Sequence, residues 1–455
     1  MDNSITSKFA AYIQDFNFDK MPEGVIVQAK RILLDTLGVI LKATSPEYSA
    51  GRILTELATI EGGNPKCTLI GRDFKTSCVQ ACLINGTMGY YCDNEPHHLG
   101  AIVHPAAVCV PTSLAFAERE KKSGKDYLAA LTLGIEVSCK VSYAINPQAL
   151  YAKGLHPTSI ACGFGALASG AYLLGLNHQQ IVNGLGLVGN QGSGLMAFAS
   201  DQTENSRPFS PGNAARNGAT AALLAGLGFG GPISIFDGKY NVFKAFSNGK
   251  ERPEELFNQK WRIKELAIKL YSSCSFTHPG LDALLEIIKE NNLTSSDIEE
   301  IDLYFPKAGA HIIDNNELKS HCAQYVFAVV AVKGNIDIDD ILKDRLEDPE
   351  IERLSKKMRV IGDVSLEKTY PDQYESIFKL KTKDGRALTK HINWPKGSEQ
   401  RPVSYDELKE KFFRVTTNII SKNRAEGILA WVETAEKQSD VEGLCSLLRL
   451  DSVKF

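Results

Sequence analysis

The chain has 455 residues, of which 43% are hydrophobic and 23% are charged, a composition typical of folded globular proteins rather than disordered ones. Its 51 Lys and Arg residues against 54 Asp and Glu residues give a formal net charge of -3, which argues against a general nucleic-acid binder because such proteins carry a basic excess. The length is too great for one small core and predicts two domains.

The N-terminal segment MDNSITSKFAAYIQDFNFDK lacks the basic and apolar regions of a signal peptide. The most apolar stretch, ACGFGALASGAYLLGL at 161–176, is rich in small residues, which favours a buried core helix over a membrane span. Ten cysteines are scattered singly along the chain, as is usual in a reducing compartment. We therefore expect a cytoplasmic protein with neither a membrane nor a nucleic-acid partner.

Residues 1 to about 260 show apolar residues at helical spacing in one run after another, interrupted by Gly and Pro: 16–44, 77–92, 106–120, 125–145 and 214–231. The glycine-rich stretches GFGALASG and GLGLVGNQGSG follow no convincing strand. We interpret them as sites of close helix packing rather than as dinucleotide-binding loops. Residues 1–264 are thus predicted to be the first part of a helical domain.

The pattern changes after residue 264. Two segments alternate like strands, IEEIDLYFPKAG (298–309) and SIFKLKTKDGRALTKHINW (376–394), and the second contains a Lys-Asp-Gly turn. Helical runs lie between them, and SYDELKEKFFRVTTNI is helical again. The predicted fold is mainly α: a large all-helical domain, discontinuous in sequence (1–264 and 398–455), and a smaller α+β lid domain (265–397).

Three His-Pro pairs each stand before a helical run: His104-Pro105, His156-Pro157 and His278-Pro279. Proline favours the first position of a helix and excludes the preceding residue from it, so each histidine is predicted to be an N-cap. Helix N-termini attract carboxylates, and histidine can move a proton near neutral pH. We interpret the three pairs as one shared site for a small polyanion rather than as three independent capping turns.

Two cationic side chains lie near these helices in the sequence. Arg207 precedes a predicted helix and could clamp a carboxylate bidentately, although a surface salt bridge is the alternative. Lys269 stands at the predicted domain junction, where it could face the same cleft or remain solvated.

Cysteines and histidines that could suggest zinc also occur here, at positions 78, 82, 92, 97, 98 and 104. Their spacing matches no familiar zinc pattern. We therefore predict no metal.

Five stretches together resemble the MmgE/PrpD family, which includes 2-methylcitrate dehydratases, cis-aconitate decarboxylases and an iminodisuccinate epimerase. They are CDNEPHHLGAIVHPAAVCVPTSLAFAE, GLHPTSIACGFGALASGAYLLGL, SRPFSPGNAARNGATAALLAGLGFGGP, IKLYSSCSFTHPGLDALLEI and PKGSEQRPVSYDELKEKF. The resemblance covers nearly the whole chain. It implies a helical domain with a smaller lid, an active site between them, a homodimer and no organic cofactor.

The resemblance also implies roles for single residues. The implied catalytic residues are Asp93, His104, His156, Lys269 and Tyr325, and the predicted substrate-binding residues are His97, Arg207 and His278. A buried structural tyrosine is the alternative interpretation of Tyr325.

The chain departs from the family in two places. The acidic motif is reduced to DNEPHH, and Arg207 stands where cis-aconitate decarboxylases carry a lysine. Arginine is always charged and is a poor proton donor.

These features predict a cofactor-independent lyase that acts on a small di- or tricarboxylate. Dehydration of the 2-methylcitrate dehydratase type is the first choice, because the lysine of the decarboxylases is missing. Three alternatives remain open: a decarboxylase of the cis-aconitate type, an isomerase or epimerase of an iminodisuccinate-like dicarboxylate, and a carboxylate-binding protein without activity.

Overall fold

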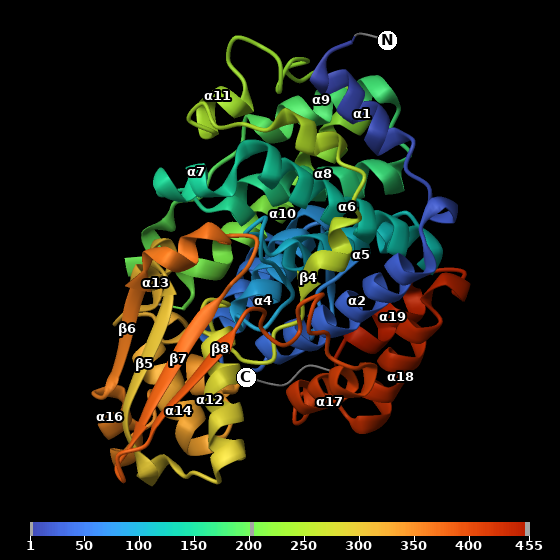
Figure 1. The fold of residues 1–455 in the computed structure, drawn as a ribbon. Helices are drawn as coiled ribbons and strands as arrows, with labels where there is room; N and C mark the ends of the chain where they lie inside the picture. Colours follow the sequence, from blue (N-terminus) through green and yellow to red (C-terminus); the bar gives the residue numbers. More distant parts are fainter. Residues whose placement is uncertain (1–2, 201–203, 451–455) are drawn as a thin grey trace.

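The computed structural model describes residues 3–200 and 204–450 and is mainly helical, with one small mixed sheet at the side of a larger helical mass (Figure 1). Two large hydrophobic cores correspond to the helical mass and to the part that contains the sheet. One is built mainly from residues before 269 together with residues 403–448, and the other mainly from residues 267–392. The predicted fold class, mainly α with a smaller α+β part, is confirmed; the domain limits after 264 and 397 stay predictions.

The helical mass is formed by helices that lie before and after the sheet in the sequence. These are α1 (Ile5–Gln14), α2 (Glu23–Ala43), α3 (Ser49–Glu61), α4 (Cys78–Tyr91), α5 (Pro105–Arg119), α6 (Gly124–Ile145), α7 (Pro147–Ala152), α8 (Pro157–Leu174), α9 (His178–Gly189), α10 (Ser206–Gly226), α11 (Val242–Phe246), α17 (Tyr405–Thr416), α18 (Lys422–Glu433) and α19 (Glu442–Leu448). Two short strand pairs accompany them: β1 (Cys67–Thr68) with β2 (Lys75–Thr76), and β3 (His97–His98) with β4 (Leu266–Ala267).

Helix α8 lies at the centre of this mass, in contact with α5, α6 and α10. Small residues allow the close approach: a Cβ added at Gly165 would lie 2.4 Å from the carbonyl oxygen of Gly134 in α6. The GFGALASG stretch thus serves helix packing, as predicted. By length and composition α6 and α8 could each cross a membrane, but 100% and 89% of their most apolar windows are buried inside the protein, as in a core helix.

The sheet has the strand order β6-β5-β7-β8, with β5 (Ile298–Pro306), β6 (Met358–Asp363), β7 (Ser376–Thr382) and β8 (Ala387–Ile392). Strand β5 runs parallel to β6 and antiparallel to β7, and β7 runs antiparallel to β8. The associated helices are α12 (His278–Asn291), α13 (Lys307–Ile313), α14 (Ala323–Lys333), α15 (Ile338–Leu342) and α16 (Pro349–Ser355). Helices α12 and α14 run alongside the sheet (Figure 1).

The β7–β8 hairpin forms where the alternating pattern and the Lys-Asp-Gly turn predict it. Gly385 adopts φ 91° in this turn, a conformation that favours glycine. Strand β6 was not predicted, because this edge strand buries little more than its first residue and so shows no clear alternation.

The C-terminal segment returns to the helical mass through α17. The ring of Phe412 lies against Gly38 of α2, where a Cβ would approach to 2.9 Å. Lys411 and Asp35 of α2 form a buried ion pair of 2.7 Å. The Lys411 ammonium also donates a hydrogen bond of 2.7 Å to the carbonyl oxygen of Asn94, so α17 helps to hold the DNEPHH loop.

Two predicted helix starts need correction. Helix α12 begins at His278 itself, with Thr277 as its N-cap, so His278 is not an N-cap. Helix α10 begins at Ser206, which places Arg207 inside its first turn rather than before it. Proline is tolerated within the first turn of a helix, so the proline that follows each residue does not fix the start to one position.

Candidate active site

The DNEPHH loop follows α4 and crosses from the helical part towards the α+β part. Asp93 adopts φ 48°, in the left-handed region that Asp tolerates better than most residues. His97 then pairs with Ala267 in the β3–β4 ladder. This pairing brings Lys269, two residues beyond β4, back to the loop.

Lys269 and Arg207 surround the carboxylate of Asp93. The Lys269 ammonium donates a hydrogen bond to Oδ1 of Asp93 and lies 3.6 Å from Oε1 of Glu95. Nη1 of Arg207 lies 3.7 Å from Oδ1 of Asp93. Burial alone would raise the pKa of Asp93, but the charges of Lys269 and Arg207 outweigh it and hold this pKa well below its usual range. Asp93 is therefore ionised between two buried cations.

Glu95 and His104 form the shortest imidazole contact of the loop. Nδ1 of His104 lies 2.5 Å from Oε1 of Glu95, whose side chain has no exposed surface. Burial and the neighbouring Asp93 charge raise the pKa of Glu95 to about 7. Burial and the Lys269 charge hold the pKa of His104 well below its usual range. The His104 ring is therefore neutral near neutral pH, where Glu95 gains or loses its proton.

His104 is the N-cap of α5 and His156 the N-cap of α8, as predicted. The His104 backbone N–H donates a hydrogen bond of 3.2 Å to Oγ1 of Thr158, which ties the two helix starts together. Nδ1 of His156 lies 2.9 Å from Oγ of Ser159 in its own first turn. Burial and the Arg207 charge lower the pKa of His156 to about 3, so its ring is neutral at physiological pH.

Tyr90, near the end of α4, contacts both Arg207 and the imidazole of His104. Its ring stacks under the Arg207 guanidinium at 4.5 Å and lies 4.6 Å from the ring of His104. Nη2 of Arg207 donates a hydrogen bond of 3.2 Å to the carbonyl oxygen of Tyr91. The guanidinium is therefore fixed before any ligand arrives.

Several buried polar atoms of this cluster lack a hydrogen-bond partner among residues 3–200 and 204–450. They are Oδ2 of Asp93, Oε2 of Glu95, Nδ1 of His97, and Nε and Nη1 of Arg207. Unsatisfied buried polar atoms are costly in a folded protein and often mark a site that a ligand or water completes. The cluster has both donors and acceptors to offer.

A cavity of about 40 Å³ lies within the cluster. Five of the eight predicted site residues line it: Asp93, His97, His104, His156 and Lys269. Arg207 lies directly behind Asp93 and Tyr90. The structure thus brings six predicted residues together, although their roles stay predictions.

The other two predicted residues lie elsewhere. His278 does not line the cavity. Its Nε2 lies 3.2 Å from the carbonyl oxygen of Ser273. Tyr325 donates a hydrogen bond of 2.9 Å to the carbonyl oxygen of Asp340 and lines a different hollow in the α+β part. These surroundings fit the alternative interpretation of Tyr325 as a buried structural tyrosine, and its catalytic role stays a prediction.

Three further residues of the site were not predicted. Tyr90 and His321 line the cavity, and Glu95 contacts His104. His321 comes from the α+β part, and its Nδ1 lies 4.0 Å from Oδ2 of Asp93. Burial is the main cause that lowers its pKa to about 4. Glu95 could have been chosen from its place inside the DNEPHH motif, whereas nothing local to His321 in the sequence indicates a site.

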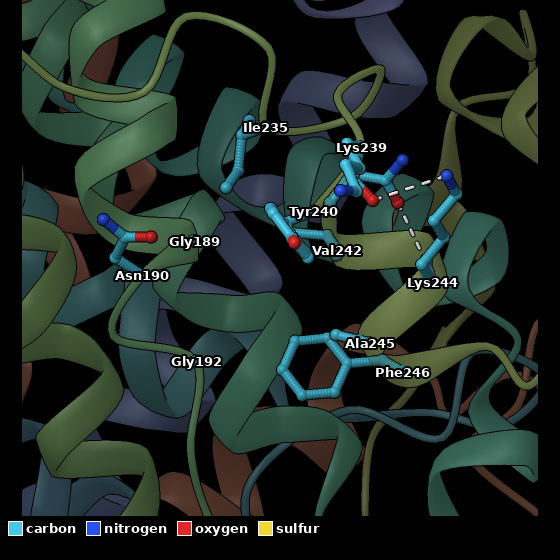
Figure 2. Close-up of a pocket in the computed structure, with 11 residues that line it drawn as sticks. Gly189, Asn190, Gly192, Ile235, Lys239, Tyr240, Val242, Lys244, Ala245 and Phe246 are labelled. Atoms are coloured by element: carbon cyan, nitrogen blue, oxygen red, sulfur yellow. Dashed lines mark hydrogen bonds between the residues drawn. The ribbon is translucent and has the colours of Figure 1, made fainter.

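A larger hollow of about 460 Å³ lies in the helical part, between the end of α9 and α11 (Figure 2). Its charged lining residues are Lys239 and Lys244, and no histidine or carboxylate is among the residues that line it. The smaller cavity, by contrast, gathers four imidazoles, a carboxylate and a lysine, so we place the candidate active site there.

No group of three or more His, Cys, Asp or Glu side chains arranged to hold a metal is found within residues 3–200 and 204–450. All ten cysteines are free thiols. Of the residues that might suggest zinc, His97 and His104 line the cavity, whereas Nε2 of His98 lies 2.9 Å from Oε2 of Glu265.

Buried imidazoles, carboxylates and cations, the side chains that acid–base enzymes use, lie where the helical part meets the α+β part. A family model described as the MmgE/PrpD N-terminal domain matches residues 7–255, and one described as the MmgE/PrpD C-terminal domain matches residues 271–437. The chain belongs to the MmgE/PrpD family.

Curated relatives match over nearly their full length. The chain is 27% identical to a cis-aconitate decarboxylase of Mus musculus, with 100% of this chain and 95% of the relative covered. It is 27% identical to a cis-aconitate decarboxylase of Homo sapiens, with 99% and 95% covered. It is 24% identical to a mitochondrial 2-methylcitrate dehydratase of Yarrowia lipolytica (strain CLIB 122 / E 150), with 94% and 86% covered.

Proposed function

We propose that this chain is a cofactor-independent lyase that removes water from a small tricarboxylate of the 2-methylcitrate type. The observation that carries the proposal is the buried contact of Glu95 with His104 beside the Lys269–Asp93–Arg207 cluster. Loss of water next to a carboxylate needs a group that takes a proton from carbon, a group that protonates the departing hydroxyl, and cations that stabilise the developing negative charge.

His104 is the group that we assign to the proton on carbon. Its Nδ1 is engaged by Glu95, and its Nε2 makes no hydrogen bond to a residue that the structure describes. Because the ring is neutral, Nε2 can accept a proton, and the adjacent Glu95 carboxylate stabilises the imidazolium that forms.

His156 faces the same cavity from α8, and its Nε2 lies 3.5 Å from the Tyr90 hydroxyl. We assign the protonation of the departing hydroxyl to this pair. Lys269 and Arg207 bind the carboxylates of the substrate and stabilise the enediolate-like charge on the reacting end. Asp93 holds these two cations in place until the substrate competes for them.

A second candidate function is decarboxylation of a cis-aconitate-like substrate. Identity of 27% over the full length to cis-aconitate decarboxylases favours it. The same cations and histidine would serve, since loss of CO₂ also leaves a carbanion that must be stabilised and then protonated. Arg207 is the feature that disfavours it if the corresponding position must give up a proton.

Proton NMR in D₂O tests these functions directly. Purified protein would be incubated with 2-methylcitrate, citrate, cis-aconitate and iminodisuccinate, with EDTA present throughout. Loss of water supports the first proposal and loss of CO₂ the second. Incorporation of deuterium without loss of either would identify an isomerase. Thermal stabilisation without turnover would leave a carboxylate-binding protein.

A further inference from the structure

A second, larger hollow adjoins the candidate active site. The inner cavity of about 40 Å³ and an outer chamber of about 520 Å³ share three lining residues, Tyr151, Met196 and Ile312. These come from α7, the 196–200 turn and α13, so both the helical part and the α+β part form the boundary. The two hollows are therefore neighbours separated by three side chains.

The walls of the two hollows differ in chemistry. The inner cavity has charged and titratable walls that include Asp93, Lys269 and four imidazoles. The outer chamber is walled largely by alanine, methionine, isoleucine and tyrosine side chains, and no Asp, Glu, Lys or Arg is among its ten lining residues. Its polar lining residues are Gln148, His311 and Asn316. A carboxylate that reached the outer chamber would find no Lys or Arg side chain there.

The inner cavity is also too small for a whole tricarboxylate. A volume of about 40 Å³ has room for only a few water molecules. In the wall of the outer chamber, Asn316 donates a hydrogen bond of 3.0 Å to the carbonyl oxygen of Ala199 and so joins the α+β part to the helical part. A bound substrate must therefore push into the outer chamber or move its walls.

From these observations, and resting on the proposed function, we propose that the outer chamber binds an uncharged, mainly apolar substituent of the substrate. The substrate class is then a di- or tricarboxylate that carries an alkyl or aryl group longer than methyl. The inner cavity binds the carboxylates at the reacting end, and the substituent passes between Tyr151, Met196 and Ile312. Apolar contact in the chamber supplies binding free energy in proportion to the area that it buries.

Calorimetric titration with succinate and with 2-methyl-, 2-butyl- and 2-hexylsuccinate tests this inference without requiring turnover. Each methylene that enters the chamber is expected to lower Kd about fourfold. Ala152→Leu and Ala308→Leu fill the chamber from α7 and from α13, and either substitution is expected to abolish most of this dependence on chain length. Ala387→Leu, on the exposed strand β8, is the matched control and should keep it.

The outcomes separate the inference from the function on which it rests. A Kd that does not change with chain length, in a protein that turns over 2-methylcitrate or cis-aconitate, overturns the inference alone and leaves the chamber as a passage. A dependence on chain length that survives both filling substitutions also overturns it. Absence of both succinate binding and turnover overturns the proposed function and the inference together.

Discussion

Nδ1 of His104 lies 2.5 Å from Oε1 of a fully buried Glu95. The carboxylate therefore fixes the orientation of the ring and leaves Nε2 on the side of the cavity. The carboxylate also makes the ring more basic, because a negative charge stabilises a neighbouring imidazolium. Glu95 is thus a positioning residue in this account, and His104 is the group that meets the substrate.

Glu95→Gln keeps a hydrogen-bond acceptor for Nδ1 but removes the charge. We expect kcat to fall about 10²-fold, the scale of general acid–base catalysis, while KM changes little, since the cations that bind the substrate remain. Glu136→Gln is a matched control, because Glu136 is also buried, its pKa is also raised to about 7 mainly by burial, and it lies outside the cavity. Initial rates against substrate concentration and pH measure the effect. Equal losses of kcat in the two variants would contradict the positioning role.

Asp93→Asn tests the competition between Asp93 and the substrate for Lys269 and Arg207. Asn suits the φ of 48° at this position, so backbone strain is not a complication. Without the carboxylate, the two cations are unpaired and should bind anions more tightly. We expect a Kd for citrate about tenfold lower, a scale set by about 1.4 kcal/mol of electrostatic interaction, and an unfolding free energy about 3 kcal/mol lower. Weaker citrate binding in the variant, measured by calorimetry, would refute this competition.

Arg207→Lys tests whether this residue holds a carboxylate or gives up a proton. Lysine cannot reproduce both the stacking on Tyr90 and the hydrogen bond to the carbonyl oxygen of Tyr91. If Arg207 only binds, KM should rise about tenfold and the products should stay the same. A gain of CO₂ release at the expense of dehydration, followed by NMR of the products, would instead show that this position selects the reaction.

The stability of the protein should depend on pH through its buried histidines. The pKa of His156 is lowered to about 3 and that of His321 to about 4, in both cases first by burial. Between those values and the unfolded value of about 6.5 the unfolded chain binds more protons than the native one, so stability is lost as pH falls through this window. Burial raises the pKa of Glu95 to about 7. Between about pH 4.5 and pH 7 the native state therefore binds more protons at Glu95 than the unfolded chain does, so this group adds stability as the pH falls.

The pKa values of His97, His104 and His278 are lowered as well, so five histidines outnumber Glu95 and Glu136, the two carboxyls whose pKa is raised to about 7. We therefore expect a net loss of stability below about pH 6.5. Each neutral histidine contributes about 1.4 kcal/mol per pH unit. Urea unfolding at pH 7.5, 6.0 and 5.0 measures the loss, and His321→Asn should make the curve shallower. A stability that is flat or rises towards pH 5 would contradict the burial of neutral imidazoles.

Much of the fold and part of the site could be predicted from local sequence patterns. His104 and His156 could be placed because proline favours the first position of a helix, although the same pattern misplaced the start of α12 by one residue at His278. The β7–β8 hairpin could be placed because its turn residues and its alternation agree. The edge strand β6 could not, because most of its residues are partly exposed and its partner β5 lies about fifty residues earlier in the sequence.

The remaining site residues depend on tertiary structure. Tyr325 lies four residues from His321, yet only His321 lines the cavity, because the intervening chain turns from a 3-10 segment into α14 and directs the two side chains to different hollows. Local sequence patterns do not predict which hollow each of these two side chains enters. Glu95 was visible as an acid in the motif, but its role depends on the return of the chain to His104 nine residues later.

The most direct test of the account is the rate of water loss from 2-methylcitrate, measured by proton NMR for the wild-type protein and for His104→Asn, with citrate binding measured by calorimetry in parallel. We expect turnover by the wild type, a fall of at least about 10³-fold in the variant, and citrate affinity within a few-fold of wild type. A variant that keeps most of its rate, or a wild-type protein that binds citrate but releases neither water nor CO₂ from any carboxylate of the panel, would contradict the claim that this buried histidine moves the proton.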